Sequence, residues 1–361
     1  MSGQTDMRPA ADQSSLLRSH AEKLRTSSLR SRHEVKEVAT APAPHVATAP
    51  LASVAVRSYR RLPQLLELLE RLLQQDYPNF EIVVIEQSVV ERAAYAAQLA
   101  ALQRDSRLRI LYYGALGAGR ARIEAARHCR GEVIVFMDDD DLPMRKDWLR
   151  AFMRNFADPL CMAVSGRQVE TPSAAGRRGT RRDRKLCLRY TFLRMPRGRM
   201  RHLSRIEGVT QVAGGNAAIR ASAIARAGGW DAEDDHDEDS LNFRFARVRR
   251  RGEYFAYDPE PVMLRRLDIP GGLARRAQTV SERVRVELRY SHRVVRKYFP
   301  GRFYALYPCY VWLAASRALQ HVRRAQPERS RRQLLAELAT TAPRAYLAEL
   351  ARALRMPSLH F

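Results

Sequence analysis

A short apolar run that leads directly into four carboxylates constrains this chain more than any other feature. Residues 133–137 are five consecutive apolar residues, three of them β-branched, and Asp138 to Asp141 follow without a spacer. Such a run is typical of a strand buried on both faces in a parallel sheet. The Asp run then lies at the carboxyl end of the strand, which is the edge where open α/β sheets bind ligands.

Four adjacent carboxylates repel one another unless cations lie between them. Mg²⁺ and Mn²⁺ prefer oxygen ligands and are often shared with substrate phosphates, so either ion suits such a run. The same residues also suit an acidic turn that caps a helix beginning near Arg145, because Asp is common at helix N-termini. The run by itself leaves both interpretations open.

The chain around this run alternates between strand and helix patterns. Apolar runs predict strands at 51–57, 80–88, 108–113 and 132–137, and apolar residues at helical spacing predict helices at 62–73, 90–102 and 119–129. Further strands are expected at 160–165, 254–258 and 262–267, and a further helix at 240–251. This alternation predicts βαβ units with right-handed crossovers. The expected fold class is therefore α/β, with a mostly parallel sheet and flanking helices.

Composition narrows the class of protein. With 361 residues, 45% of them apolar, the chain can bury one large α/β core with extensions or two domains, which excludes wholesale disorder. The formal net charge is +24, almost all of it from Arg, and predicts attraction to nucleic acid, anionic lipid or phosphorylated substrates. Codon bias in the source genome explains the arginines equally well. The four cysteines form no CxxC pair, which argues against a zinc site and fits a reducing compartment.

Changes in composition divide the chain into three regions. Residues 1–50 are polar and basic, end in an Ala/Pro-rich run and lack the apolar segment of a signal peptide, so a disordered tail is expected. Residues 51–269 contain the alternation of strands and helices. Residues 270–361 change to helical spacing, with basic amphipathic helices expected at 280–299, 303–322 and 331–354.

The C-terminal region has aromatic residues beside many arginines. Its apolar stretch 303–315 is shorter than the roughly 18 to 20 residues that a membrane span needs, and Pro308 interrupts it. Basic amphipathic helices with interfacial aromatic residues instead favour reversible binding to an anionic membrane surface. Packing of these helices on the core is the alternative. We therefore expect a cytoplasmic protein, either free or peripheral on the inner face of the cell membrane.

Several segments between residues 51 and 266 resemble one protein family. The segments 56–61, 74–88 and 131–143 look like the nucleotide-sugar domain of family 2 glycosyltransferases, which have the GT-A fold. The later segments 214–220, 228–231 and 238–239 are similar to the acceptor side of that family. Each motif is short, but their order and spacing make the combined match specific. The resemblance implies an inverting glycosyltransferase that uses a nucleoside diphosphate sugar and Mn²⁺ or Mg²⁺.

The resemblance assigns the donor side residue by residue. Asp138 and Asp140 match the metal-binding DxD motif of the family, and Asp139 lies beside them, within reach of the ribose or the diphosphate. Arg57 and Ser58 end the first strand on the same donor side. The family often has a His after its last core strand, but residues 261–266 contain none, which leaves metal ligation from that side open.

Three further residues are expected near the donor. Glu86 stands where the family usually has an Asp that faces the nucleotide base. A Glu can accept a hydrogen bond from a uracil-type N–H but reaches farther, so a UDP-sugar is the first candidate and the base stays open. Arg122 matches a family Arg near the diphosphate, and both Arg120 and Arg122 lie near a helix N-terminus, where they can contact phosphates. A solvated helix face is the alternative for these two arginines.

The acceptor side is expected to use residues of the later segments. Gly215 and Asn216 form a permissive turn that suits close approach of a substrate, although a plain turn has the same sequence. Trp230 and Asp231 follow in the next matching segment. The resemblance implies that these four residues bind the acceptor, which can be a polysaccharide, a glycolipid or a protein.

A second acidic cluster, at 231–239, precedes the helix expected at 240–251. Direct attack by an acceptor hydroxyl requires a carboxylate that takes its proton, apart from the carboxylates that bind metal. The resemblance assigns this general base to Asp239, with Glu238 as its alternate. His236 in the same cluster is expected to be a solvated surface residue.

Two other functions use similar features. A nucleotidyltransferase also has an α/β sheet and a carboxylate-bound metal, but it would have a Gly-rich phosphate loop after the first strand, and residues 58–61 are not one. A non-catalytic basic protein would bind nucleic acid or membrane through its arginines. The two acidic clusters would repel phosphate unless a metal were bound, so this interpretation leaves them unexplained. Glycosyl transfer without specific nucleic-acid binding is therefore the expected function.

Overall fold

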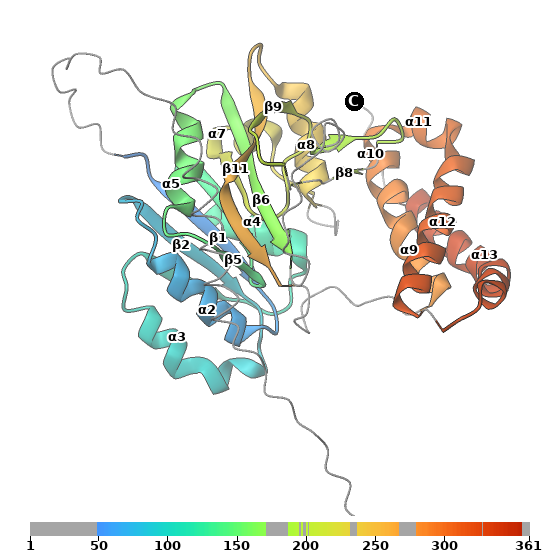
Figure 1. Cartoon of the computed structure of the whole chain (residues 1–361), viewed down its shortest axis with the longest axis horizontal. Helices are drawn as coiled ribbons and strands as arrows, with labels where there is room; N and C mark the ends of the chain where they lie inside the picture. The colour runs from blue at the N-terminus through green and yellow to red at the C-terminus, as the bar shows by residue number, and fades with distance from the viewer. Residues whose placement is uncertain are drawn as a thin grey trace, which may run out of the picture.

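The computed structural model describes residues 49–170, 187–194, 196–197, 200, 202–231, 237–266, 279–326 and 328–355 (Figure 1). The expected N-terminal tail up to residue 48, most of the Arg-rich segment after Glu170, His236 and the segment 267–278 lie outside these ranges. Within them, a large sheet is built from β3 (Leu108–Tyr112), β2 (Phe80–Glu86), β1 (Ala52–Ser58), β4 (Val133–Asp138), β10 (Ala217–Arg220), β6 (Cys161–Glu170), β11 (Tyr254–Arg265) and β5 (Asp141–Pro143), in that order, with β9 (Ile206–Val209) paired to β11.

The strands of the first half run parallel, as the sequence predicted. β1 lies between β2 and β4, and β3 borders β2. The register pairs Ser58 with Glu86 and Arg57 with Asp138. The carboxyl ends of β1, β2 and β4 therefore meet at one edge of the sheet.

The second half of the sheet is mixed. β10 runs antiparallel between β4 and β6, while β11 is parallel to β6 and antiparallel to β5 and β9. The two strands predicted at 254–258 and 262–267 are one strand, β11, whose register shifts between Tyr257 and Val262. Pro259 and Pro261 lie in this irregular stretch, where the ladder of hydrogen bonds is already interrupted. The sequence patterns missed β5, β9 and β10 because each has only three or four residues.

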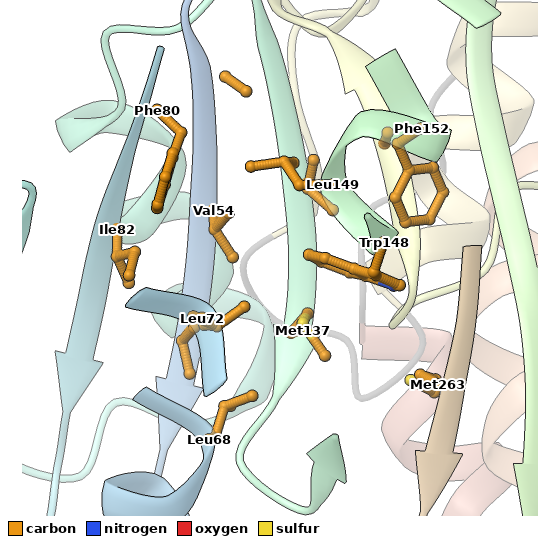
Figure 2. Close-up of a cluster of buried hydrophobic side chains, with 14 of the residues drawn as sticks. Val54, Leu68, Leu72, Phe80, Ile82, Met137, Trp148, Leu149, Phe152 and Met263 are labelled. Atoms are coloured by element: carbon orange, nitrogen blue, oxygen red, sulfur yellow. The ribbon is translucent and has the colours of Figure 1, made fainter. Parts of the chain in front are cut away.

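Helices cover both faces of the sheet. α2 (Leu62–Leu73), α3 (Ala96–Leu102) and α5 (Trp148–Met153) cover one face, and α4 (Ala118–His128), α7 (Ala221–Ala227) and α8 (Asp237–Val248) cover the other. Side chains alternate between these faces along each strand, so Val54 packs with the first group and Ala55 with the second. Figure 2 shows the first group, where Leu68 and Leu72 of α2 lie in front of β1, the strand that carries Val54. This double cover explains the continuous apolar runs of the strands.

Short 3-10 segments continue two of these helices. The helix predicted at 90–102 begins as the 3-10 helix η1 (Glu91–Tyr95) before α3, and η2 (Arg154–Ala157) extends α5. The predicted helix at 62–73 has the bounds of α2, with Pro63 in its first turn. The predicted helix at 240–251 forms three residues earlier, as α8.

The C-terminal region is helical, as predicted. α9 (Val280–Arg289) continues through a π-helical turn, η3 (Tyr290–Val295), into α10 (Arg296–Tyr298), and α11 (Pro300–Ala305), α12 (Tyr307–Ala325) and α13 (Arg331–Arg355) follow. Thr279 starts α9 with a capping box, in which its side chain accepts from the Glu282 N–H and Glu282 reaches back to the Thr279 N–H. Apolar residues of α9, α12 and α13 share one cluster. Among the described residues, no helix is long and apolar enough to cross a membrane.

The C-terminal helices pack against α8 through aromatic rings. The Phe243 ring of α8 lies 5.5 Å from the Tyr298 ring and 4.8 Å from the Phe299 ring, centroid to centroid. A small hairpin of β7 (Arg189–Tyr190) and β8 (Pro196–Arg197) is held in the same place, because the Tyr310 hydroxyl donates to the carbonyl of Leu193, 3.0 Å away. In Figure 1 these helices form a group beside α8, away from β1 and β2.

Candidate active site

The Asp run turns sharply from one strand into another, and this turn brings three carboxylates together. Asp138 is the last residue of β4, and Asp141 is the first residue of β5. One oxygen from each of Asp138, Asp140 and Asp141 lies within 4.8 Å of the other two. Three converging carboxylate oxygens are a donor set that suits a hard divalent cation. The structure thus brings Asp138 and Asp140 together, as expected of metal ligands, and adds Asp141.

Asp139 points away from this cluster and holds the loop after β1. Its carboxylate accepts from the Ser58 hydroxyl at 2.9 Å and from the Tyr59 N–H at 3.1 Å. The Arg61 guanidinium bridges Asp139 and Asp140, at 3.1 and 2.7 Å. Asp139 and Ser58, both predicted to bind the donor, are therefore bonded to each other and shape the edge at which the donor was expected.

Arg57 and Arg265 hold the carboxylates of the cluster from two sides. Arg57 Nε lies 2.6 Å from Asp138 Oδ1, and its Nη1 donates to the carbonyl of Ala118. Arg265, the last residue of β11, contacts both oxygens of Asp141 at 3.0 and 3.1 Å, and its Nη2 lies 3.5 Å from Asp138 Oδ2. The stretch 261–266, where the resembled family often has a His, thus places an arginine beside the carboxylates here.

The charges around the cluster set its protonation. Burial alone would raise the pKa of Asp138, but the surrounding guanidinium groups, first that of Arg57, outweigh burial and hold this pKa below its usual range. Burial raises the pKa of Asp139 to about 6, because Arg61 offsets the loss of solvation only in part. Asp138 is therefore ionised at neutral pH, as a metal ligand must be.

The two arginines predicted near the donor point in different directions. Arg122 is buried, and its Nη2 donates to the carbonyl of Gly214 at 2.8 Å. Its guanidinium lies over the Phe136 ring, 5.7 Å from the centroid, and lines a small cavity together with Arg57 and Phe136. Arg120 is exposed to solvent at the first turn of α4. Arg122 therefore lies beneath the cluster, whereas Arg120 is on the solvated face of the helix.

Glu86 is committed to the fold. It is fully buried at the end of β2, where its carboxylate accepts from the Ser88 N–H at 2.5 Å and from Arg92 Nε at 2.8 Å. Arg92 also lies over the Tyr112 ring, 4.5 Å from its centroid. Glu86 is thus fully buried with both carboxylate oxygens bonded inside the protein, and its contact with a nucleotide base stays a prediction.

Gly215 and Asn216 have different roles. A Cβ atom at Gly215 would lie 3.0 Å from Asp141 Oδ2 and 3.1 Å from Arg265 Nη2, so the absence of a side chain lets the backbone approach the cluster. Asn216 is fully buried and donates to the carbonyls of Arg167 and Pro261 at 2.9 and 3.0 Å. Its side-chain oxygen accepts from the Trp148 indole N–H at 2.8 Å. The Asn216 side chain therefore joins β6, β11 and α5 and is not presented to an acceptor.

Trp230 and Asp231, both predicted to bind the acceptor, also serve the packing. Trp230 is buried and meets the Phe136 ring edge to face at 5.3 Å. Asp231 is buried and forms ion pairs with Arg244 of α8 and, at 2.7 Å, with Lys297 of α10. The Tyr298 hydroxyl donates to the same carboxylate at 2.8 Å. Asp231 thus connects the sheet domain to the C-terminal helices.

Asp239 lies in the first turn of α8 and is buried, with a hydrogen bond from the Tyr190 hydroxyl to its carboxylate. The Glu238 side chain lies outside the described residues. One turn later, Asn242 accepts from the Val212 N–H at 3.0 Å. Val212 is three residues from Gly215, a span of about 10 Å at most, so the start of α8 faces the loop that abuts the acidic cluster.

No role in the cluster was assigned from the sequence to Asp141, Arg61 or Arg265. Asp141 belongs to the Asp run, but only the pairing of β5 with β11 turns it toward Asp138. Arg61 and Arg265 were visible as basic residues, the first in the loop after β1 and the second at the end of β11. Arg61 is 78 residues from its partner Asp139, and Arg265 is 124 residues from its partner Asp141. No local pattern reveals pairs this far apart in the sequence.

Comparisons with known proteins agree with the fold. Residues 53–228 match the family model for glycosyl transferase family 2. The uncharacterized glycosyltransferase EpsJ of Bacillus subtilis is 32% identical over 92 residues, and an uncharacterized glycosyltransferase of Haemophilus influenzae is 30% identical over 95 residues. These alignments cover 26% and 25% of this chain and only 26% and 30% of the two relatives.

The fold likeness extends over almost the whole chain. The mannosyltransferase PcManGT from Pyrobaculum calidifontis, solved with GDP-Man and Mn²⁺, superposes with a TM-score of 0.50 and 20% identity over 94% of each chain. The sheet and the carboxylates at its edge define a GT-A domain. Residues 53–228 form a glycosyl transferase family 2 domain, as the motifs predicted.

Proposed function

We propose that this protein transfers a sugar from a nucleoside diphosphate sugar to an acceptor hydroxyl, with the help of a divalent cation. The observation that carries the proposal is the convergence of Asp138, Asp140 and Asp141 at the carboxyl edge of β1 and β4. Ligands of open α/β sheets bind at this edge. The match to the glycosyl transferase family 2 model and the glycosyltransferase relatives support the same activity.

Mn²⁺ or Mg²⁺ is the proposed cofactor, and Asp138, Asp140 and Asp141 are the residues that would hold it. When bound, such an ion neutralises the charge that develops on a departing diphosphate. Arg57 and Arg122 line the cavity beside Asp138 and would orient the same phosphates through their guanidinium groups. Ser58 and Asp139 hold the loop after β1 in place around them.

The reaction is proposed to invert the configuration at the sugar. The acceptor oxygen forms a bond to the anomeric carbon as the bond from that carbon to the diphosphate oxygen breaks, and the acceptor proton passes to a carboxylate. Asp239 is the proposed base, because it lies in the first turn of α8, near the loop that carries Gly215. The Tyr190 hydroxyl donates to this carboxylate, so it must give way to the acceptor hydroxyl.

The donor is proposed to be a UDP-sugar, with a GDP-sugar as the second candidate. Glu86 would act through the segment it holds, since Ser88 and Arg92 bond to its carboxylate and follow β2 at the site edge. The solved mannosyltransferase with the similar fold binds GDP-Man, which motivates a test of both bases. A carbohydrate or lipid-linked acceptor is proposed on the α8 side.

An anionic membrane surface is proposed as a further partner, which would place a cytoplasmic protein on the inner face of the membrane. Two aromatic side chains of the C-terminal helices are exposed, Trp312 by 70% and Tyr304 by 53%. Aromatic residues beside arginines suit the interface between water and lipid. Vesicle sedimentation tests this: binding to anionic vesicles at low salt should be lost at high salt and weakened in Trp312→Ala, and absence of binding at low salt contradicts it.

A donor screen tests the proposed activity. Purified protein is incubated with UDP- and GDP-sugars and with acceptor extracts, and nucleotide release is measured with Mn²⁺, with Mg²⁺ and with chelator. We expect release from one donor class that stops in chelator. Absence of release from every donor with acceptors present would contradict glycosyl transfer by this protein.

A further inference from the structure

Arg265 lies inside the carboxylate cluster, where a bound cation was expected. It ends β11, and the register of β11 and β5 places it directly opposite Asp141. The guanidinium takes both oxygens of Asp141, which is fully buried, and its Nη2 approaches Asp138 Oδ2 at 3.5 Å. Two of the three carboxylates that would hold a metal ion are thus held by one arginine.

The surrounding backbone accommodates this ion pair. A side chain at Gly215 would place its Cβ 3.0 Å from Asp141 Oδ2, 3.1 Å from Arg265 Nη2 and 3.4 Å from Asp138 Oδ2. The carboxylates around Arg265, Asp141 above all, raise the pKa of its guanidinium, so it remains a cation at any physiological pH. Arg265 is therefore an integral part of the carboxylate cluster, because the backbone at Gly215 is packed around its ion pair with Asp141.

Charge determines what this arrangement can bind. The carboxylates of 138–141 lie against the guanidinium groups of Arg57, Arg61 and Arg265, so positive and negative groups nearly balance at the site. A divalent cation alone would face three arginines, and a diphosphate alone would face four carboxylates. The charge of the divalent cation cancels the charge of the donor diphosphate, so binding both leaves the net charge of the site unchanged. Arg265 can then pair with phosphate oxygens once it leaves the carboxylates.

We propose that Arg265 makes cation binding depend on the nucleotide: it competes with the cation for Asp138 and Asp141 and exchanges these carboxylates for the donor diphosphate. This inference rests on the proposed function. Linkage requires that the nucleotide strengthens cation binding by the same factor by which the cation strengthens nucleotide binding. The competition makes Arg265 a positioning residue that keeps the site from holding a cation without its donor.

The test measures Mn²⁺ affinity directly, by electron paramagnetic resonance of free Mn²⁺, with and without UDP or GDP. In the wild type, nucleotide should tighten Mn²⁺ binding at least about tenfold. In Arg265→Gln, Mn²⁺ alone should bind at least about tenfold tighter than in the wild type, and the nucleotide should add little. A purely structural role for Arg265 predicts the opposite sign, because a damaged site loses cation affinity.

Two further variants keep the result interpretable. Arg60→Gln removes the same charge from a neighbouring exposed arginine that pairs with Glu91 and not with the cluster, and it should leave the coupling unchanged. Arg265→Lys keeps the cation but loses the two-point contact with Asp141, so it should fall between wild type and Arg265→Gln. Arg265→Gln leaves the buried Asp141 without a charged partner and can misfold. Arg265→Lys keeps a positive charge beside Asp141, so the test still has a folded variant in that case.

The outcomes separate the two proposals. If wild-type protein binds neither nucleotide in the presence of Mn²⁺, the proposed function is wrong. If it does bind, but both Arg265 variants hold Mn²⁺ alone no more tightly than the wild type, the competition by Arg265 is wrong and the proposed function stands. Gain of Mn²⁺ affinity in Arg60→Gln as large as in Arg265→Gln would also overturn the inference, since general charge would then explain both.

Discussion

The chain has two acidic clusters in an otherwise basic sequence, and the structure uses them in opposite ways. In the first, the carboxylates of Asp138, Asp140 and Asp141 converge on one point between strands. In the second, Asp231 and Asp239 are buried separately, one against Arg244 and the C-terminal helices and the other beneath the Tyr190 hydroxyl. Acidic density therefore does not distinguish a binding site from a structural anchor, whereas convergence does.

The backbone explains the difference. A turn between β4 and β5 reverses the chain, so side chains that are neighbours in sequence face one another across it. The second cluster leads into a helix, where successive side chains point about 100° apart and reach different neighbours.

The sharpest test replaces the one residue of the second cluster to which we assign chemistry. Asp239→Asn keeps shape and hydrogen bonding but cannot take a proton, so it should lower turnover about 10²- to 10⁴-fold. Metal-dependent nucleotide binding should stay unchanged, as calorimetry can check. Glu238→Gln is the matched control. Near wild-type turnover in Asp239→Asn with loss in Glu238→Gln would exchange the two roles, and retention in both would place the base elsewhere.

A substitution in the first cluster should affect nucleotide binding as well as turnover. Asp140→Asn removes one candidate ligand of the cation, so we expect a loss of metal-dependent nucleotide binding and a fall in turnover of about 10² to 10³. Titration calorimetry with and without chelator measures the first effect. Asp147→Asn, an exposed carboxylate that pairs with Arg145, is the control. Unchanged nucleotide affinity in Asp140→Asn, or in chelator, would remove the metal from the site.

Asp231 should matter for stability and not for donor binding. Asp231→Ala leaves Lys297 and Arg244 without their buried partner, which should cost about 3 to 5 kcal/mol of the free energy of unfolding. Denaturant titration followed by tryptophan fluorescence measures the loss. A double-mutant cycle with Lys297→Met isolates the contact across the two regions. Wild-type stability in Asp231→Ala would contradict its role as an anchor.

The same anchor should have a smaller pH effect. Burial opposes ionisation of Asp231, but Lys297, Tyr298 and Arg244 outweigh it and hold its pKa below the usual value. A lowered folded-state pKa contributes stability above the unfolded pKa of about 3.9 and loses it as pH falls further. The difference in unfolding free energy between wild type and Asp231→Asn should therefore be constant above about pH 5 and shrink toward pH 3. A difference that does not change with pH would contradict this assignment.

Local patterns predicted what depends on neighbours along the chain. The bounds of α2 followed from Leu spacing and Pro63, and β4 followed from its apolar run. The patterns also placed Asp138 and Asp140 at the sheet edge. They could not tell that Asp139 turns away and Asp141 turns in, because that depends on the pairing of β5 with a strand more than a hundred residues later.

Residue types that serve both packing and chemistry were the hardest to assign. Glu86 and Asp231 match family positions and are acidic, yet their partners are the protein's own Arg92, Lys297 and Arg244. These partners come from other elements, and the sequence gives no sign of the pairing. The arginine surplus makes such pairs common in this chain, so a match to a motif says less about a carboxylate here than in a less basic protein.

Asn216 combines two demands that almost no other residue meets. Its backbone is left-handed, with a φ of 53°, which favours Gly, Asn or Asp. Its side chain must also donate to two carbonyls and accept from Trp148, which Gly and Asp cannot do together. Asparagine is therefore essentially the only residue that position 216 tolerates. A saturation library of this chain should therefore show very few tolerated substitutions at position 216.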